Sequence, residues 1–243
     1  MYTFGPIAAA IAFASTVLTA LTTVLTPLAG AAGAAAAIVC LTAIVRVAVL
    51  PLSVAQVRGE KARARLAPRL LALREKHAEN PQRLVAEQQR VYTEEGTSPL
   101  AGCLPMLAQM PVFIVLYGLF TSATISGAPN GLLTHTLGGV PLGATLGDVL
   151  AVGSGPQSAV FAVLLVVLTG VAWASRRWLA LPALTASAAS GAPVLPGAQA
   201  MSYLSFGTVA IAAFVPLAAG LYLATTTAWT VAERLALRHL ITG

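Results

Sequence analysis

Residues 40–56 read CLTAIVRVAVLPLSVAQ, an apolar stretch with one arginine, Arg46, near its middle. The residues on both sides of Arg46 suit a lipid environment, yet a guanidinium group stays protonated at any ordinary pH. An arginine near the centre of a membrane helix costs about 2.5–3.5 kcal/mol on insertion scales. Such a position therefore needs water or a partner for the charge.

The composition of the 243 residues predicts the class of protein. The chain is 57% hydrophobic and only 9% charged, whereas soluble domains carry about 25% charged residues. Several apolar runs approach the roughly 20 residues that a helix needs to cross a bilayer. The short alternating segments typical of membrane barrels are not visible. We therefore expect an all-α, multi-pass membrane protein.

Five spans are predicted from the apolar runs, and the N-terminal region is set apart from them. Residues 1–32 contain hydrophobic positions at spacings of three and four beside a row of Ser and Thr, which indicates an amphipathic helix lying along the membrane interface, although a true span stays open. Residues 180–199 are interpreted as a linker and 123–156 as a loop. The expected spans cover residues 34–55, 99–122, 157–175, 201–215 and 217–233, with a break at Pro216.

A charged segment separates the first two spans. Residues 56–96 contain nine of the 14 Lys and Arg residues and six of the eight Asp and Glu residues, so they cannot rest in lipid. Asn80 followed by Pro81 is typical of a helix start, and Gly96 is a common helix stop. The segment is therefore predicted to be a hairpin of two helices in the cytoplasm.

The positions of the basic residues predict the orientation. Ten of the 14 lie between Arg46 and Arg90, and the other four are Arg176, Arg177, Arg234 and Arg238. With the N-terminus outside, every basic loop and the C-terminus fall on the cytoplasmic side, as the positive-inside rule requires. We expect a multi-pass protein of the cell membrane, with no direct nucleic-acid function.

No acidic residue lies within a span as an obvious partner of Arg46, and Glu233 stands at a span end. A water-filled cavity around Arg46 is therefore favoured over snorkelling or an ion pair. Gln109, Tyr222, Thr226 and Thr227 are polar residues of other spans that could line it, or could serve only as interhelical hydrogen-bond partners.

No pattern in the chain indicates catalysis or a bound group. Cys40 and Cys103 have no metal or disulfide spacing, and the histidines are scattered. Gly153-Ser154-Gly155 lacks the nucleophile elbow of a hydrolase, and no phosphate-binding glycine loop occurs. We expect no catalytic residue, no metal and no cofactor.

The motifs resemble the YidC/Oxa/Alb family of membrane protein insertases. The resemblance is carried by IVRVAVLPLSVAQ (44–56), by LAPRLLALREKH (66–77), by the run from Asn80 to Phe120 and by Pro216 to Glu233. The most specific part is SPLAGCLPMLAQMPVFIVLYGLF (98–120). Leu223, where an aromatic is common, and Glu233, where glutamine is usual, depart from the pattern, and the long basic tail of many relatives does not follow Gly243.

The resemblance implies an insertase core over residues 33–243 behind an outer interfacial helix. Arg46 would be the positive residue of a hydrophilic groove that is open to the cytoplasm and receives the hydrophilic end of a client. Gln109, Tyr222 and Thr226 would line this groove, while Met110 and Phe113 would offer an apolar face to the client. Implied partners are newly made membrane proteins and the bilayer, with the Sec translocon and the ribosome as further candidates.

Two other functions remain open at this point. A small anion transporter would use Arg46 as its binding site, but no repeat relates the two halves of the chain, and the charged hairpin would have no explanation. A structural scaffold would not need the charge of Arg46 at all.

Overall fold

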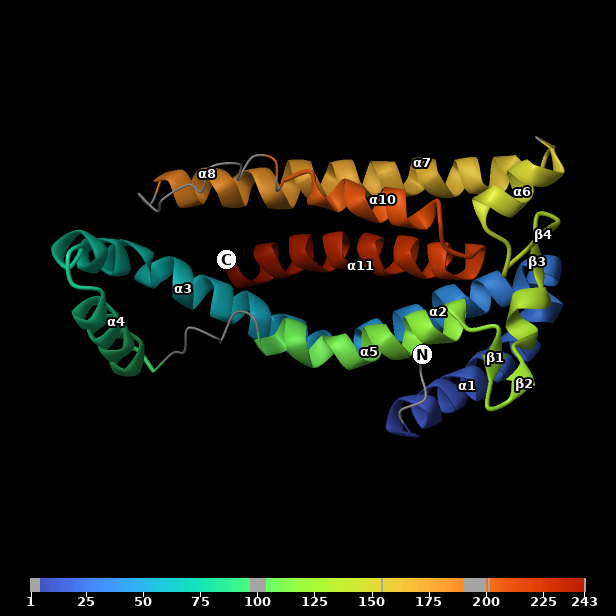
Figure 1. Cartoon of the computed structure of the whole chain (residues 1–243), viewed down its shortest axis with the longest axis horizontal. Coiled ribbons are helices and arrows are strands. Elements are labelled where there is room, and N and C mark those ends of the chain that lie inside the picture. The colour runs from blue at the N-terminus through green and yellow to red at the C-terminus, as the bar shows by residue number, and fades with distance from the viewer. Residues whose placement is uncertain (1–4, 97–103, 154, 190–199, 201, 243) are drawn as a thin grey trace.

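The computed structural model describes residues 5–96, 104–153, 155–189, 200 and 202–242; within these ranges the side chains of residues 63, 104–109, 186–189, 238, 239, 241 and 242 are not described. The described chain is mostly helical, as expected. Its long helices run side by side along the long axis of the molecule, with the hairpin at one end and the short strands at the other (Figure 1).

The first two helices fold back on each other. Helix α1 (Gly5–Ala29) and helix α2 (Gly33–Ala48) are joined by the 3-10 turn η1 (Gly30–Ala32), in which Gly30 has a φ of 55°. A Cβ on Gly33 would lie 2.8 Å from the Cα of Thr26. Only glycine permits this close approach, so α1 lies directly against α2.

The face that α1 buries largely follows the predicted stripe. Ile11, Ala14 and Leu18, which recur at spacings of three and four, are buried, while Leu28 at the end of this series is 82% exposed. Leu28 follows Pro27 in the last turn of α1. Whether α1 lies on the membrane or crosses it stays a prediction.

The predicted span 34–55 is divided between two helices. Helix α2 ends at Ala48 and helix α3 (Leu50–Lys76) begins after Val49. Pro51 stands in the first turn of α3, where its missing N–H costs nothing, but it cannot continue an existing helix. The break therefore falls at Val49, three residues after Arg46.

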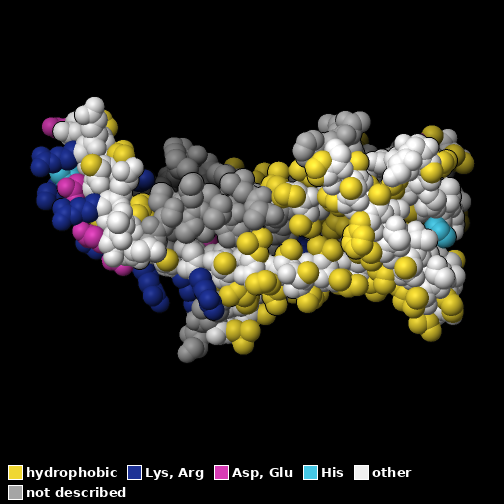
Figure 2. Space-filling view, turned by 90° about the horizontal axis from the view of Figure 1, so that it is seen from below, with side chains coloured by type: hydrophobic (Ala, Val, Ile, Leu, Met, Phe, Trp, Pro, Cys, Tyr) yellow, Lys and Arg dark blue, Asp and Glu magenta, His cyan; other side chains and the backbone are white. Residues whose placement is uncertain are grey.

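Helix α3 and helix α4 (Pro81–Glu94) form the charged hairpin. The side chain of Asn80 accepts a hydrogen bond from the backbone N–H of Arg83 at 3.0 Å, as predicted for a helix cap. Arg69 bridges to Glu94 and Glu95 at 3.0 and 3.1 Å across the two arms. Lys and Arg side chains gather at this end of the molecule, whereas hydrophobic side chains cover much of the rest (Figure 2).

Helix α5 (Leu104–Thr121) occupies the region of the second predicted span, of which residues 99–103 lie outside the described chain. Residues 123–156, predicted as a loop, contain short elements: two antiparallel strand pairs, β1 (Thr124–Ile125) with β2 (Ala128–Pro129) and β3 (Thr136–Leu137) with β4 (Val140–Pro141), the 3-10 turn η2 (Gly131–Thr134) and helix α6 (Leu146–Val152).

Helix α7 (Ser158–Ser175) continues through one π-helical turn, η3 (Arg176–Ala180), into helix α8 (Leu181–Ala189). The prediction of a linker over 180–199 was therefore wrong for residues 180–189, because Ala and Leu favour a helix and Pro182 stands in the first turn of α8, where proline is tolerated. Residues 190–199 lie outside the described chain.

The C-terminal apolar region divides at Pro216, as predicted, but unequally. A 3-10 turn, η4 (Leu204–Phe206), leads into the short helix α10 (Gly207–Ala212), and helix α11 runs from Leu217 to Thr242. The predicted spans 201–215 and 217–233 are therefore a short helix and a long one; α11 passes Glu233 because charge ends a span but need not end a helix.

In the described residues, two stretches are long and apolar enough to cross a membrane by length and composition, Gly5–Ala48 and Ser158–Thr185, and Met110–Thr121 is a shorter apolar helix. The core contains fully buried side chains from α2, α5, α7 and α11, among them Ile38, Phe120, Phe161 and Leu217. The coarse prediction of an α-helical membrane protein is confirmed, while the count of five spans stays a prediction.

Candidate functional site: a cationic cavity between α2, α5 and α11

Arg46 lies in the last turn of α2 and reaches across to α11. Its Nε donates to the Oγ1 of Thr226 at 2.9 Å, and its Nη2 donates to the same hydroxyl at 2.5 Å, to the carbonyl oxygen of Thr226 at 3.1 Å and to the Oγ1 of Thr230 at 3.0 Å. The guanidinium is therefore held on one side by two threonines one helical turn apart.

Thr230 is oriented to accept from the arginine. The hydroxyl of Thr230 donates its own proton to the carbonyl of Thr226 at 2.8 Å, so that only its lone pairs face Arg46. A hydroxyl can serve as both donor and acceptor, and this back-bond fixes which role it takes. Thr226 and Thr230 are uncharged and so do not neutralise the guanidinium. Arg46 has no ion pair with an acidic residue in the described part of the chain.

The Nη1 atom of Arg46 has no hydrogen-bond partner among the described residues. Arg46 lines a cavity of about 340 Å³ between α2, α3, α5 and α11. Because a guanidinium forms a planar fork of donors that matches a carboxylate, the unused side of Arg46 can bind an acidic group entering the cavity. The residues lining the cavity are Arg46, Ser53, Gln56, Val57, Met110, Phe113, Tyr222, Thr226, Thr230, Glu233, Arg234 and Leu237.

The cavity extends from the aromatic interior to the hairpin end. Tyr222 is 4% exposed, and its ring lies 5.6 Å from that of Phe120 and 6.1 Å from that of Phe113. From Tyr222 to Leu237 the lining residues of α11 cover fifteen residues, or about 22 Å of helix. Near the hairpin end Arg234 pairs with Glu60 at 3.3 Å, and Gln56 donates to Glu60 at 3.2 Å. The lining thus becomes more polar and more charged toward the hairpin.

Met110 and Phe113 are 47% and 39% exposed and line one wall of the cavity from α5. They place apolar, accessible surface beside the cationic interior. The predicted residues Arg46, Tyr222, Thr226, Met110 and Phe113 thus lie around one cavity. The side chain of Gln109 lies outside the described residues.

Thr227, also considered for this cavity, does not line it. Its hydroxyl donates to the carbonyls of Leu223 and Ala224 at 2.6 and 3.1 Å, and its side chain borders a smaller cavity of about 140 Å³ against α7 and α10. A rotation of 100° per residue places neighbouring threonines on different faces of a helix. Thr230, Ser53 and Gln56 were missed, although the four-residue spacing from Thr226 to Thr230 is a signal that could have found the first of them.

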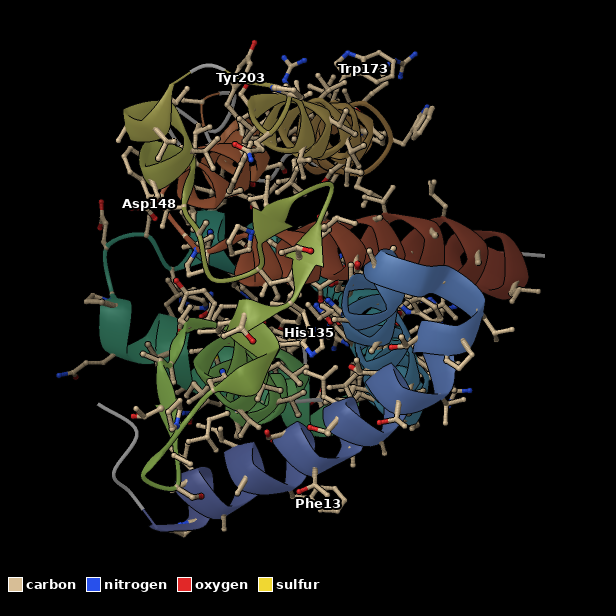
Figure 3. The ribbon with its side chains drawn as sticks, turned by 90° about the vertical axis from the view of Figure 1, so that its right-hand side faces the viewer. Phe13, His135, Asp148, Trp173 and Tyr203 are labelled. Atoms are coloured by element: carbon tan, nitrogen blue, oxygen red, sulfur yellow. The ribbon has the colours of Figure 1, made fainter. Side chains whose placement is uncertain are left out.

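The opposite end of the bundle is capped by the segment between α5 and α7. The backbone N–H groups of Leu217 and Ala218, at the start of α11, donate to the carbonyls of Ala144 and Leu142, each at 2.9 Å. Asn130 donates to the carbonyls of Leu119 and Ser122 at 2.9 and 3.0 Å, at the end of α5. The short strands and η2 lie across the helix ends in the end-on view (Figure 3). Backbone N–H groups at the start of α11 and backbone carbonyls at the end of α5 thus find their hydrogen-bond partners in this cap.

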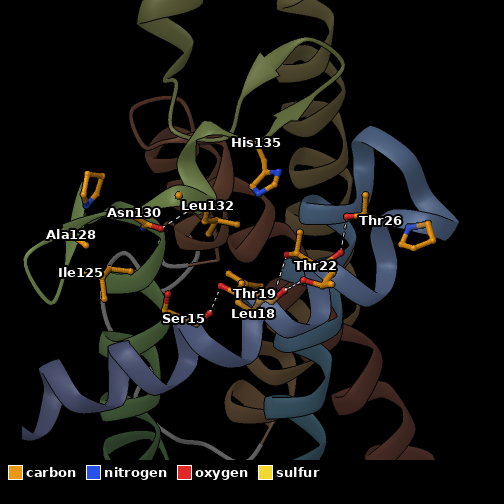
Figure 4. A pocket seen from close by; sticks show the side chains of 14 residues that line it. Ser15, Leu18, Thr19, Thr22, Thr26, Ile125, Ala128, Asn130, Leu132 and His135 are labelled. Carbon is orange, nitrogen blue, oxygen red and sulfur yellow. Dashed lines mark hydrogen bonds between the residues drawn. The ribbon is translucent and has the colours of Figure 1, made fainter.

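A second, larger cavity of about 640 Å³ lies between α1 and this cap, with His135 beside it (Figure 4). Hydroxyls of α1 line it, but those of Thr19, Thr22, Thr23 and Thr26 each donate to a carbonyl of their own helix. Lys, Arg, Asp and Glu are all absent from its lining. It therefore lacks the permanent charge that distinguishes the Arg46 cavity.

An α-helical membrane protein with a cationic, hydroxyl-lined cavity is thus the class that fold and site define. Residues 24–242 match the family described as 60Kd inner membrane protein. The chain belongs to this family, which is the YidC/Oxa/Alb family.

Named relatives agree with this membership. The chain is 35% identical over 151 residues to "Inner membrane ALBINO3-like protein 2, chloroplastic" of Chlamydomonas reinhardtii, covering 62% of this chain and 34% of the relative. It is 42% identical over 100 residues to "Membrane protein insertase YidC" of Bordetella petrii, covering 41% and 18%, and 37% identical over 84 residues to the protein of that name in Clostridium perfringens, covering 35% of each. The matched segments span about a third or less of these relatives.

Proposed function

We propose that this protein is a membrane protein insertase in which Arg46 receives the hydrophilic end of a client. Family membership and the printed names of the relatives support the insertase activity. The observation that supports the role of Arg46 is its partly satisfied guanidinium: Thr226 and Thr230 bind Nε and Nη2, Nη1 has no hydrogen-bond partner among the described residues, and Arg46 lines the cavity.

The cavity would act by shortening the path that polar groups travel through lipid. An unsatisfied polar group in hydrocarbon costs several kcal/mol. A client tail resting against Arg46, Thr226 and Tyr222 would keep hydrogen-bond partners and water to that depth. The apolar segment that follows would leave past Met110 and Phe113, which offer exposed hydrophobic surface on the same wall.

In this proposal the hairpin end faces the cytoplasm of the cell and the cap of residues 123–156 faces outward. Newly made membrane proteins would enter from the hairpin end. The Sec translocon and the ribosome are further candidate partners, and the charged hairpin is the accessible surface that they would meet. No nucleotide, metal or catalytic side chain has a part in the mechanism.

Reconstitution tests the proposal. Purified protein in liposomes should increase protease-protected insertion of a single-span client with an acidic tail, and Arg46→Ala should lower that insertion about tenfold, because a hydrogen bond to a charged group is worth about 1.5–3 kcal/mol. Thr227→Val, which removes a hydroxyl facing away from the cavity, is the matched control. A client with an uncharged tail should lose much less.

The same liposomes separate the alternatives. Anion flux that requires Arg46, with no effect on insertion, would identify a transporter instead. Full insertion by Arg46→Leu would show that the charge of Arg46 has no part in insertion, and no insertion by either protein would support a structural scaffold. Crosslinking from positions beside Arg46 to a nascent membrane protein should succeed, and its consistent failure would rule out the proposed groove.

A further inference from the structure

The exposed face of α7 ends in an arginine. Val163, Val166 and Val167 are 64%, 71% and 48% exposed, and Trp173 is 54% exposed on the same side of the helix. Arg177, four residues after Trp173, continues this face and is exposed. The opposite face of α7 buries Phe161, Leu164, Leu168 and Ala172 against the core. The exposed apolar face is therefore the one that meets lipid, and Arg177 stands at its end.

The π-helical turn η3 brings together two aromatic side chains that flank this arginine in sequence. Residues five apart lie about 140° apart around an α-helix, but a π turn, with i→i+5 hydrogen bonds, brings them close to one face. The N–H of Leu181 donates to the carbonyl of Arg176 in this pattern. As a result the rings of Trp173 and Trp178 meet edge to face with centroids 6.0 Å apart, with Arg177 between them in sequence.

Arg176 extends the positive charge toward α10. Its guanidinium carbon lies 4.3 Å from the ring centroid of Tyr203, its Nη2 donates to the Tyr203 hydroxyl at 3.1 Å and its Nε donates to the hydroxyl of Ser202 at 3.3 Å. Neither Arg176 nor Arg177 forms a salt bridge among the residues that the structure describes. Two positive charges thus lie together beside exposed aromatic rings at the rim of the bundle, where Figure 3 shows Trp173 and Tyr203.

We propose that Trp173, Arg176, Arg177, Trp178 and Tyr203 form a binding site for the headgroup of an anionic phospholipid. Arg177 binds the phosphate, and the two tryptophans hold the glycerol and carbonyl region, where such rings prefer to lie. From Val167 to Arg177 there are ten residues, or about 15 Å of helix, which is half of the roughly 30 Å hydrocarbon core of a bilayer. A lipid with its phosphate at Arg177 therefore fits its acyl chains along the exposed valines.

The charge of the site selects the lipid. Two guanidiniums that form no salt bridge within the described part of the chain repel the ammonium of a zwitterionic headgroup and attract a net negative one. Each basic residue near an anionic membrane surface contributes about 1 kcal/mol, equivalent to roughly fivefold in affinity. The site does not involve the Arg46 cavity, and lipid binding here does not depend on insertase activity.

Native mass spectrometry of the intact protein, extracted from vesicles of equal phosphatidylglycerol and phosphatidylcholine, tests the site. Wild type should retain phosphatidylglycerol in preference to phosphatidylcholine, and Arg177→Gln should lower that retention about fivefold. Arg83→Gln, which removes a charge that is also exposed from α4, is the matched control and should leave the retention of phosphatidylglycerol unchanged. An equal loss in both variants would mean that only diffuse charge attracts the lipid, and would overturn the site.

Two further arms complete the test. Trp173→Leu keeps the apolar face but removes the ring, and it should lower retention while the thermal stability stays within a few degrees of wild type. Inorganic phosphate at millimolar concentration should not displace the lipid, because the acyl chains contribute to binding. Displacement by phosphate alone would identify a site for the free anion and contradict the proposed lipid.

Discussion

At the scale of single residues, Arg46 shows how an apolar bundle can keep a charge without neutralising it. Four hydrogen bonds to Thr226 and Thr230 replace part of the water that the guanidinium loses. A carboxylate in their place would compete with any acidic client. Threonine hydroxyls are acceptors without charge, so that they hold Arg46 while its electrostatic attraction for an anion persists. The hydroxyl of Thr230 donates backward to its own helix, which leaves its lone pairs for the guanidinium.

Replacing Thr226 by valine should weaken both stability and insertion. Valine has nearly the same shape but leaves Nε of Arg46 without its acceptor, and an unsatisfied donor costs about 1–3 kcal/mol. Thermal unfolding in detergent and the liposome insertion assay should both report the loss. Thr225→Val, whose hydroxyl donates only to the carbonyl of Leu221, is the control, and an equal loss there would mean that Thr226 has no special role.

At the scale of helices and turns, the outcome of the sequence predictions depends on whether a local signal exists. Asn80 and Pro81 start α4 as predicted because a cap acts within three residues. The break at Val49 was missed because Pro51 is compatible with the first turn of a new helix, and hydrophobicity is continuous across it. Helix α8 was missed because Ala-rich sequence with Pro182 at a helix start reads as a linker when its packing is unknown.

The junction of α1 and α2 should depend on Gly33. A methyl group at this position would lie 2.8 Å from both the Cα and the hydroxyl of Thr26, and backbone atoms cannot move aside cheaply. Gly33→Ala should therefore lower the melting temperature by several degrees. In Gly170→Ala the new methyl meets nothing within 4 Å, and alanine favours a helix, so this variant should be neutral or slightly stabilising.

The cap of α6 should respond to acid. The carboxylate of Asp148 accepts hydrogen bonds from the backbone N–H and the hydroxyl of Thr145 at 2.8 and 2.7 Å, and these bonds lower the pKa of Asp148 below its usual value. A lowered pKa in the folded state means that the stabilisation is complete above the unfolded pKa, about 3.9, and is lost as the pH falls through the folded value.

Hydrogen exchange can measure this loss at α6. Protection of the α6 amides, corrected for intrinsic rates, should fall below pH 4 in wild type. In Asp148→Asn, which has no titrating carboxyl group, protection should be lower at neutral pH and nearly independent of pH in this range. A wild-type profile that stays flat to pH 2 would contradict the role of the capping carboxylate.

At the scale of the whole molecule, charge and polarity divide the protein into two ends. The hairpin lies at one end, with the C-terminal end of α11 directed toward it, and the cap of residues 123–156 lies at the other end (Figure 1). Charge counting could predict this division because it needs only the order of the segments. It could not predict that Arg46 meets Thr226 and Thr230, because that contact joins residues 180 and 184 positions apart and depends on how α2 packs against α11.

The orientation of these two ends in the membrane is directly testable. In a background with Cys40 and Cys103 replaced by alanine, a single cysteine at Thr134 lies in the cap and one at Glu79 lies at the tip of the hairpin. Both positions are exposed, so access to reagent depends on the side of the membrane. A membrane-impermeant maleimide added to intact cells should label the cysteine at position 134 and leave the one at position 79 unlabelled until the cells are opened. Labelling of position 79 from outside would reverse the orientation and, with it, the direction from which clients reach Arg46.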